Sequence, residues 1–359
     1  MRESLNKIAD KVTEYLTKSN FYDNIELDFL KDAIKDYPLR GGKRLRPALL
    51  IWSARLFDEN IAIEKLLPAA AAIEIYHNWT LVHDDIIDND EVRRNQKSCH
   101  ALLNEYAQKN RPLHRERSER FGLEFAILAG DVQQAWAMNE ILNLASQQNV
   151  DAKLTIAIAQ RLNEIVNCKL ISGEAFDIDF SYCNWLEIST EQINHMIYLK
   201  TAVLLQFAAE TGVAIALNCA DFKNNESINK ISEFVYCAGL AFQYRDDWLG
   251  IFGDFEKFGK PICSDLSENK PTILLSYALK NSSETDHHRL LELSGQARYT
   301  HDEITEIQNI VRDSGAEQYL IDLMTNLKTD ALNILKECPN NKYRNYLHKC
   351  LNYFIERDV

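Results

Sequence analysis

Three aspartates lie within five residues of one another in the first third of the chain. Asp84, Asp85 and Asp88 belong to LVHDDIIDNDEVRR, residues 81–94, which follows a long apolar stretch. On a helix, Asp84 and Asp88 share one face, and Asp85 lies about 100° around it. Carboxylates this close repel one another unless a cation lies between them. Hard oxygen ligands in this number suit Mg²⁺, which also keeps positions for water and phosphate. A solvated acidic helix end is the alternative interpretation.

A second pair of aspartates repeats this arrangement. Asp246 and Asp247 end the apolar part of FQYRDDWLGIFGDFEKFGKP, residues 242–261. The same segment continues with the glycines Gly250, Gly253 and Gly259, and its charged residues include Asp254, Lys257 and Lys260. Two such clusters, each at the end of an apolar helix, predict that two helices present carboxylates across one cavity. Their shared ligand is then a polyanion bridged by several Mg²⁺ ions, as in diphosphate chemistry.

Cations gather in two further places. Residues 40–47, RGGKRLRP, hold four cations and no acid. Glycines let a backbone approach an anion closely, and the start of the following helix adds partial positive charge. The segment is not a P-loop, because G-x-x-x-x-G-K-[ST] is absent, and a basic surface turn is the alternative. Arg93 and Arg94 directly follow the first acidic cluster, and arginine side chains match phosphate oxygens with paired hydrogen bonds.

Helices must position these residues. Apolar residues recur at three- and four-residue spacing through most of the chain, which is the helical period. Glycine (12) and proline (7) are scarce, and hairpin signals such as Asn-Gly are absent, so we do not expect an all-β fold. Four segments are suited to central helices: residues 61–88, 123–145, 193–217 and 231–252. We therefore predict an all-α, single-domain helical bundle over residues 1–359.

One segment interrupts the helical pattern. Residues 104–121, NEYAQKNRPLHRERSERF, are dense in charges and contain Pro112. We expect a solvated polar loop or a frayed helix there, and a functional lid is the alternative.

The composition is that of an ordinary globular protein, with 46% hydrophobic and 26% charged residues among 359. Lys and Arg total 40 against 53 Asp and Glu, and the net charge of −13 argues against nucleic-acid binding. We see neither an apolar run of about eighteen residues nor a signal peptide, so we expect no transmembrane segment and a cytoplasmic location. The eight cysteines stand singly without C-x-x-C, so we expect buried reduced thiols.

Taken together, these motifs resemble those of the trans-isoprenyl diphosphate synthases (polyprenyl synthetases). The similarity covers nearly the whole chain, in the family's order: GGKRLRP at 41–47, HDDIID at 83–88, LAGD at 128–131, GEAFD at 173–177, Lys200-Thr201, FQYRDD at 242–247 and GKPICSDLSENKPT at 259–272. The resemblance implies the isoprenoid (terpenoid) synthase fold around a central cavity, and a homodimer. It also implies a Mg²⁺-dependent prenyltransferase that condenses isopentenyl diphosphate with an allylic prenyl diphosphate.

The resemblance also implies residue roles. Three Mg²⁺ ions per active site would be held by Asp84, Asp85, Asp88, Asp246 and Asp247. The positions that match isopentenyl diphosphate ligands are Lys43, Arg46, His77 and Arg94. Those that match allylic diphosphate ligands are Arg93, Lys200 and Lys260. Thr201 and Gln243 match positions near the developing carbocation. His77 lies seven residues, two helical turns, before Asp84, so both face one side of the helix.

The residues before Asp84 bear on product length. Trp79 lies five residues earlier, about 7.5 Å along a helix, and in the family a bulky aromatic at this position stops elongation early. We assign Trp79, Tyr76 and Thr80 to chain-length control, which favours farnesyl or geranylgeranyl diphosphate as product. A longer-chain polyprenyl diphosphate synthase is the alternative, and Trp79 as core packing is another interpretation of that residue.

Some positions depart from the family pattern. Gly250 stands where many members carry a third aspartate, and the role of Asp254 stays open. The chain reads NQKSCH after Arg94, where G-x-P-T-x-H is common, and 104–121 resembles an insertion. Two other functions on the same fold are alternatives. A terpene cyclase would not need the isopentenyl diphosphate residues kept here, and a non-catalytic partner subunit would be expected to lose one acidic motif.

Overall fold

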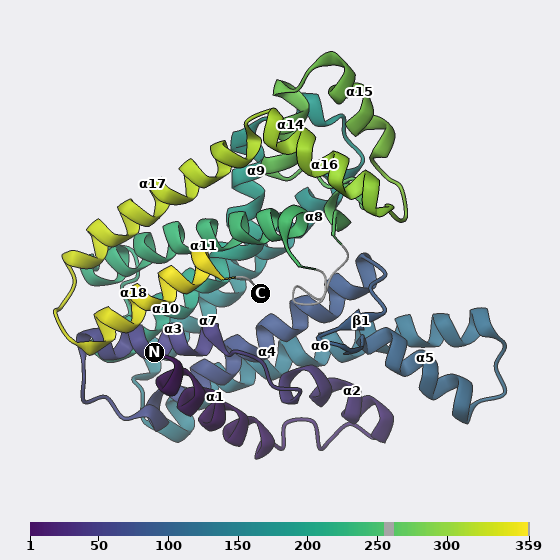
Figure 1. Cartoon of the computed structure of the whole chain (residues 1–359). Coiled ribbons are helices and arrows are strands. Elements are labelled where there is room, and N and C mark those ends of the chain that lie inside the picture. The colour runs from purple at the N-terminus through teal and green to yellow at the C-terminus, as the bar shows by residue number, and fades with distance from the viewer. Residues whose placement is uncertain (255–261, 358–359) are drawn as a thin grey trace. The chain divides into compact units, whose positions relative to one another are not determined.

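The computed structural model describes residues 1–254 and 262–357, and Figure 1 shows that helices make up most of them. The chain forms two compact units, Met1–Arg161 with Ala208–Asn225, and Leu162–Phe207 with Glu226–Val359. The predicted all-α fold is confirmed, since the strands assigned in the described residues form one two-stranded pair. The single-domain interpretation of residues 1–359 stays a prediction.

The first unit contains most elements of the N-terminal half. They are α1 (Arg2–Thr17), α2 (Asp28–Leu39), α3 (Leu45–Phe57), α4 (Ile63–Ile87), β1 (Val92–Arg93), β2 (Gln96–Lys97), α5 (Cys99–Asn110), α6 (Arg115–Gln148) and α7 (Ala152–Gln160). The core of this unit is built on α4, which packs against α1, α2, α3, α5 and α6. Four successive alanines, Ala69 to Ala72, are fully buried, so α4 is covered on all sides as its apolar composition predicts.

The second unit contains the later helices. They are the π-helix η1 (Arg161–Asn167), α8 (Cys168–Ser181), the 3₁₀ helix η2 (Trp185–Glu187), α9 (Thr190–Ile197), the π-helix η3 (Tyr198–Ala202), α11 (Glu226–Phe252), α13 (Ser264–Ser267), α14 (Ile273–Asn281), α15 (Glu284–Leu293), α16 (His301–Asp313), α17 (Ala316–Lys336) and α18 (Lys342–Glu356). Helix α10 (Val203–Leu217) has residues in both units. The core of the second unit forms along α11, which packs against α9, η3, α14, α16, α17 and α18.

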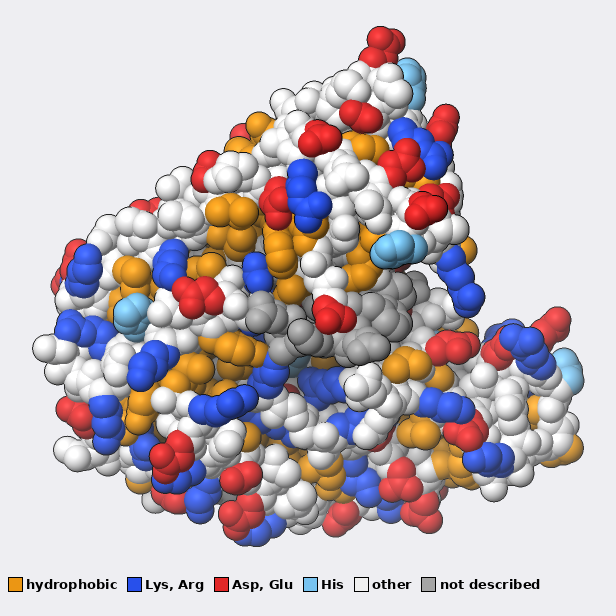
Figure 2. Space-filling view, in the orientation of Figure 1, with side chains coloured by type: hydrophobic (Ala, Val, Ile, Leu, Met, Phe, Trp, Pro, Cys, Tyr) orange, Lys and Arg blue, Asp and Glu red, His pale blue; other side chains and the backbone are white. Residues whose placement is uncertain are grey.

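Residues 104–121 are mostly helical, which corrects the expected loop. They form the second half of α5 and the first two turns of α6, and only 111–114 lie between the two helices. Their charges pair one helical turn apart, Lys109 with Glu105 at 2.6 Å and Arg115 with Glu119 at 2.7 Å. Such pairs stabilise an exposed helix, so a segment dense in charges of both signs is helical here. Figure 2 shows the same mixture of acidic and basic side chains over one face of the molecule.

Thr190–Leu217 is long and apolar enough to cross a membrane by length and composition alone. This differs from the sequence expectation, which found no such run. The window has a mean hydropathy of 1.3, and 78% of it is buried inside the protein. Core helices of globular proteins meet the same criterion.

The cysteines agree with the sequence expectation only in part. All eight are free, and five of them are buried: Cys99, Cys237, Cys263, Cys338 and Cys350. Cys168 and Cys183 are exposed and Cys219 is half-buried, so the prediction of buried thiols is wrong for Cys168 and Cys183.

Candidate active site

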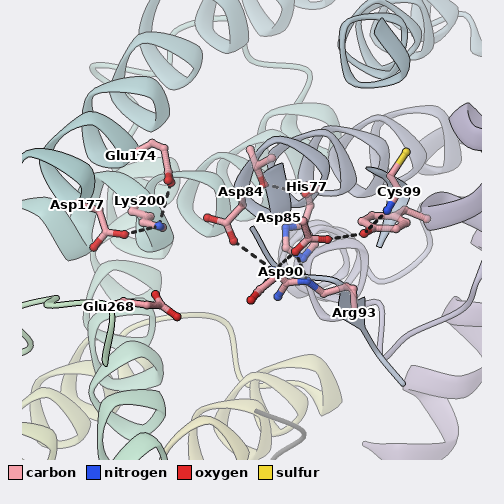
Figure 3. Close-up of polar contacts among 12 residues, drawn as sticks. His77, Asp84, Asp85, Asp90, Arg93, Cys99, Glu174, Asp177, Lys200 and Glu268 are labelled. Atoms are coloured by element: carbon pink, nitrogen blue, oxygen red, sulfur yellow. Dashed lines mark hydrogen bonds and ion pairs between the residues drawn. The ribbon is translucent and has the colours of Figure 1, made fainter. Parts of the chain in front are cut away.

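The end of α4 carries the first acidic cluster. Asp84 and Asp85 lie in its last turn, and Asp88 is the C-cap, whose backbone N–H donates to the Asp84 carbonyl oxygen at 2.8 Å. Figure 3 shows Arg93 beside this helix end. Arg93 Nη2 lies 3.4 Å from Asp84 Oδ2, and Arg93 Nε donates to Asp85 Oδ1 at 2.6 Å. The guanidinium thus offsets part of the negative charge that the sequence concentrates here.

Asp85 differs from its neighbours because it is buried. Its side chain is 1% exposed, whereas that of Asp84 is 19% exposed. Tyr37 on α2 donates a hydrogen bond from its hydroxyl to Asp85 Oδ2, and the Cys99 backbone N–H donates to the Tyr37 oxygen at 3.0 Å. Burial raises the pKa of Asp85, although its hydrogen-bond donors lower it. Both oxygens of Asp85 therefore accept hydrogen bonds from protein groups. Asp84 and Asp88, unlike Asp85, are only partly buried.

A short hairpin holds Arg93 and Arg94. Between β1 and β2, Arg94 and Asn95 both have positive φ, 54° and 60°, which is the pattern of a type I′ turn. A left-handed conformation costs a non-glycine residue roughly 1 kcal/mol, so contacts elsewhere must hold the turn. Arg40, the C-cap of α2, supplies them by donating to the carbonyl oxygens of Arg93 and Lys97 at 3.3 and 2.6 Å.

The cation segment 40–47 forms a loop and the start of α3. Gly41 and Gly42 have φ values of 88° and 129°, which residues with a side chain rarely adopt. A Cβ on Gly42 would lie 3.2 Å from Arg94 Nη1, and the same nitrogen donates to the Gly41 carbonyl oxygen at 2.8 Å. Gly42 therefore leaves space for the Arg94 side chain and the Gly41 carbonyl oxygen binds it, a partner that the sequence pattern did not reveal.

The cations of this loop divide into two kinds. Arg44 is buried in a left-handed conformation (φ 48°), pairs with Glu74 at 2.5 Å and donates to the Pro38 carbonyl oxygen at 2.5 Å. Lys43 is exposed and Arg46 is partly buried. Arg44 therefore fixes the loop on α4, while the two residues that the family resemblance selected remain at the surface of the unit.

His77 lies on α4, two turns before the acidic cluster, as its spacing predicts. Burial lowers the pKa of His77 well below its usual value, and the positive charges of Arg46 and Arg94 lower it further. These three predicted ligands of one diphosphate therefore lie within electrostatic reach of one another. The imidazole is neutral at pH 7, so it offers one N–H donor without adding charge.

The predicted chain-length residues lie on the same helix. Trp79 is 5% exposed, and its ring centroid lies 4.8 Å from that of Tyr76 and 5.7 Å from that of His83. Its indole Nε1 is buried without a hydrogen-bond partner. Thr80 donates a hydrogen bond from its hydroxyl to the His77 carbonyl oxygen at 2.8 Å. This packing suits both interpretations of Trp79, as a cavity floor and as a core residue.

The second acidic cluster lies at the end of α11. Gln243 donates from Nε2 to Asp247 Oδ1 at 3.0 Å, and the Thr201 hydroxyl on η3 donates to Gln243 Oε1 at 3.0 Å. Asp247 is 4% exposed, and its Oδ2 is buried without a hydrogen-bond partner in residues 1–254 and 262–357. Burial raises the pKa of Asp247 well above its usual value, and the nearby carboxylates of Asp265 and Asp246 add to this. The end of α11 therefore buries a carboxyl whose charged form is disfavoured by burial and by its acidic neighbours.

Lys200 lies in the π-helix η3, a distortion often found at functional sites. A Cβ at Gly173 would lie 2.4 Å from the Lys200 backbone nitrogen, so the glycine lets α8 pack directly on this turn. Lys200 Nζ lies 2.7 Å from Asp177 Oδ2 and 2.9 Å from Glu174 Oε2. Figure 3 shows both carboxylates directed at this lysine. Lys270 also contacts Asp177, at 3.5 Å. The α8 carboxylates thus set the position of Lys200.

The other aspartate of the second cluster has a different partner. Arg357, just after α18, pairs with Asp246 and stacks over the Phe242 ring, with its guanidinium carbon 3.8 Å from the centroid. The Arg357 backbone carbonyl also accepts a hydrogen bond from Arg245 Nε at 2.8 Å. An arginine thus occupies one oxygen of Asp246.

Sequence reasoning missed several residues of these networks. Tyr37 and Arg357 gave no signal, because nothing in their spacing relates them to the aspartates, and Arg40 was noted only as one of the four cations of residues 40–47. The motifs GEAFD and GKPICSDLSENKPT were recognised as family patterns, but no role was assigned to four residues within them: Glu174, Asp177, Asp265 and Lys270. Lys260, a predicted diphosphate ligand, lies outside the described residues. Within residues 1–254 and 262–357, no three His, Cys, Asp or Glu side chains already form a metal-binding group.

Residues 28–311 match the family described as Polyprenyl synthetase. The chain belongs to this family. It is 34% identical over 310 residues to the short chain isoprenyl diphosphate synthase of Methanocaldococcus jannaschii, covering 86% of this chain and 82% of that protein. It is 32% identical over 358 residues to the geranylgeranyl diphosphate synthase of Saccharolobus solfataricus, covering 99% and 95%.

A solved structure extends the similarity to the fold. The geranylgeranyl pyrophosphate synthase of Corynebacterium glutamicum, complexed with isoprenyl diphosphate and magnesium, superposes with a TM-score of 0.84. It is 26% identical, and the alignment covers 98% of this chain and 99% of that one. The predicted isoprenoid synthase fold and the predicted enzyme class, a trans-prenyltransferase of the polyprenyl synthetase family, are confirmed.

Proposed function

We propose that the protein condenses isopentenyl diphosphate with an allylic prenyl diphosphate to make a short-chain trans-prenyl diphosphate, of farnesyl or geranylgeranyl length. The observation that carries the proposal is the arrangement of the first unit. There, the acidic end of α4 and a separate group of hydrogen-bond donors, the cations Arg46 and Arg94 with the neutral His77, lie on one scaffold. An enzyme that condenses two prenyl diphosphate substrates needs both the acidic cluster and a second diphosphate-binding group, whereas a cyclase needs only the acidic cluster.

The acidic clusters suit Mg²⁺ on chemical grounds. Among the described residues, Asp247 keeps a buried oxygen without a hydrogen-bond partner, and burial, together with the nearby carboxylates of Asp265 and Asp246, raises its pKa well above the usual value. Asp84 and Asp88 are accessible carboxylates one turn apart, which suits an ion that shares its other positions with water and phosphate. When bound, Mg²⁺ neutralises the allylic diphosphate and makes it a better leaving group. We propose three ions per active site, held by Asp84, Asp88, Asp246 and Asp247.

Asp85 takes a different part in the proposal. Because both of its oxygens accept hydrogen bonds within the protein, it positions Arg93 instead of binding the ion directly. Arg93, Lys200 and Lys260 then bind the allylic diphosphate through charge-assisted hydrogen bonds. Lys200 is oriented for this role by Asp177 and Glu174.

The reaction follows from these positions. The allylic C–O bond breaks with its electron pair leaving on the diphosphate, and cationic groups stabilise the developing negative charge. The double bond of isopentenyl diphosphate then attacks the allylic carbon, and the departed diphosphate accepts the proton that is lost. Lys43, Arg46, His77 and Arg94 hold the second substrate. The Thr201 hydroxyl donates to Gln243, so its lone pairs are available to the developing positive charge.

A homodimer and a cytoplasmic location complete the proposal. Helix α6 exposes several large apolar side chains that a second copy would cover: Leu123, Ile127, Leu128 and Leu142. Light scattering on purified protein tests the dimer.

The cytoplasmic location is supported by eight cysteines without a disulfide, which suits a reducing compartment.

One assay tests the function. Purified protein is incubated with Mg²⁺, labelled isopentenyl diphosphate and, separately, dimethylallyl, geranyl and farnesyl diphosphates, and the dephosphorylated products are separated by chromatography. Linear alcohols of about fifteen or twenty carbons are expected. Much longer alcohols would still demonstrate the condensation reaction but would support the longer-chain alternative. No incorporation by folded protein would overturn the proposal in favour of a cyclase or a partner subunit.

A further inference from the structure

The π-helix η3 lies between two buried glycines of the second unit, one on α8 and one on α11. A Cβ on Gly173 would lie 2.4 Å from the Lys200 backbone nitrogen. A Cβ on Gly239 would lie 2.8 Å from the Ala202 Cβ. Carbon atoms that are not bonded pack about 3.5–4.0 Å apart, so both contacts require a residue without a side chain. The backbone of η3 therefore packs directly on both helices.

On α8, the glycine lies one helical turn before the partner of Lys200. Asp177 follows Gly173 by four residues, a spacing that places two residues on one helix face. The Asp177 carboxylate oxygen Oδ2 lies 2.7 Å from Lys200 Nζ, and Figure 3 shows the two side chains facing each other. The contact at Gly173 therefore sets how close α8, and with it Asp177, comes to the lysine.

Helix α11 repeats this arrangement with the next residue of the π-helix. Gln243 follows Gly239 by four residues, and its Oε1 accepts a hydrogen bond from the Thr201 hydroxyl at 3.0 Å. Gln243 Nε2 donates to Asp247 Oδ1 at 3.0 Å, so both ends of the amide are used. The contact at Gly239 therefore sets how close Gln243 comes to the Thr201 hydroxyl, and each glycine controls one of two consecutive residues of η3.

We propose that Gly173 and Gly239 are positioning residues of the reaction. Gly173 sets the position of Lys200 and so the binding of the allylic diphosphate, whereas Gly239 sets the position of Thr201 and so the rate of the chemical step. The inference rests on the proposed function, which gives Lys200 and Thr201 these parts.

The two displacements have different kinetic effects. Lys200 contacts a diphosphate that is charged before and during the reaction, so moving the lysine weakens substrate binding and raises KM. Thr201 lies near a positive charge that develops only in the transition state, so moving its hydroxyl lowers kcat. A purely structural role of the two glycines predicts no such difference.

The test of Gly239 moves one methyl group across the contact. Gly239→Ala places a Cβ 2.8 Å from that of Ala202, and the double variant G239A/A202G removes the opposing Cβ. Gly239→Ala should lower kcat by about a hundredfold, the scale for a misplaced group, with a smaller change in KM for the allylic substrate. G239A/A202G should recover at least about tenfold of that loss and most of the melting temperature, because the crowding is relieved. Ala202→Gly alone should leave kcat near that of the wild type.

The test of Gly173 uses a second variant, because the atoms nearest to a Cβ there belong to the backbone and no exchange is available. Gly173→Ala and Asp177→Asn should both raise KM for the allylic substrate by about tenfold, with a smaller change in kcat. If Gly173→Ala does not fold, Asp177→Asn alone decides this part. Leu320→Ala, at a fully buried residue of α17 in the same unit, is the control for destabilisation and should melt lower with KM and kcat unchanged.

Two results would overturn the inference. One is the same change of KM and kcat at both glycine positions, which would show only that crowding loosens the helices. The other is a G239A/A202G variant that regains the melting temperature of the wild type but stays as slow as Gly239→Ala. If the folded wild type forms no product, the proposed function fails and the positioning roles fall with it. If the wild type is active and the methyl exchange restores nothing, only the role of Gly239 fails.

Discussion

Tyr37 donates its hydroxyl hydrogen to the buried carboxylate of Asp85 and so joins α2 to the acidic end of α4. The same hydroxyl accepts a hydrogen bond from the Cys99 backbone N–H at 3.0 Å, which adds the start of α5. Because Arg93 donates to the other Asp85 oxygen at 2.6 Å, the orientation of this arginine depends on a residue more than fifty positions earlier. Tyr37 is therefore a positioning residue for the diphosphate-binding arginine.

Replacing Tyr37 with phenylalanine tests this dependence. The ring and its packing remain, but Asp85 loses a donor, and a hydrogen bond to a charged group contributes about 1.5–3 kcal/mol. We expect kcat/KM for the allylic substrate to fall by about tenfold or more, while KM for isopentenyl diphosphate changes little. Tyr22→Phe, at a buried ring packed on Trp136 in the same unit, is the control. Equal changes in both KM values would indicate a general loss of structure instead.

We expect the buried carboxyl of Asp247 to lower the stability of the metal-free protein while it serves metal binding. Asp247→Asn removes a buried ionisable carboxyl, whose Oδ2 has no hydrogen-bond partner among the described residues, and keeps the size of the side chain. We expect the variant to melt higher than the wild type in EDTA, by about 2–4 °C for each kcal/mol gained. Mg²⁺ with pyrophosphate should stabilise the wild type but not the variant, and activity should fall at least about a hundredfold. An unchanged or lower melting temperature in EDTA would contradict this account.

The sequence predicted the aspartates and their placement well. Apolar helices that end in acidic residues are local patterns, so the ends of α4 and α11 followed directly from residues 61–88 and 231–252. The partners of those aspartates did not follow. Tyr37 and Asp265 reach the clusters through tertiary contacts, and such contacts leave no periodic signal in the chain. The same limit applies to Gly42, whose lack of a side chain accommodates Arg94.

Burial of His100 makes the stability of the protein depend on pH. The ring is 7% exposed, and its Nε2 lies 3.1 Å from the Asp90 carbonyl oxygen. Burial lowers the pKa of His100 below its usual value. The unfolded chain therefore binds this proton more readily, so the contribution of His100 to stability is complete above about pH 6.5 and is lost as the pH falls through the folded-state pKa.

The variant His100→Gln isolates this contribution. Because glutamine has no titrating group, the free energy of unfolding should fall less between pH 7 and pH 5 in the variant than in the wild type. Urea unfolding at several pH values measures both curves. His288→Gln, at a histidine of α15 in the second unit, serves as the control and should follow the wild type. Parallel curves for the wild type and His100→Gln would show that His100 does not contribute to the pH dependence.

Trp79 decides between two interpretations of the α4 packing. As a floor beneath Asp84, its removal opens space for a longer prenyl chain, so Trp79→Ala should extend the product by one or more five-carbon units. As a core residue, its removal only destabilises the protein, by about 3–5 kcal/mol for a buried tryptophan. Trp52→Ala, at a fully buried tryptophan of α3, is the matched control for destabilisation alone. Chromatography of dephosphorylated products made from farnesyl diphosphate separates the two cases. A longer alcohol from Trp79→Ala but not from Trp52→Ala assigns the floor to Trp79, and equal product lengths assign Trp79 to the core.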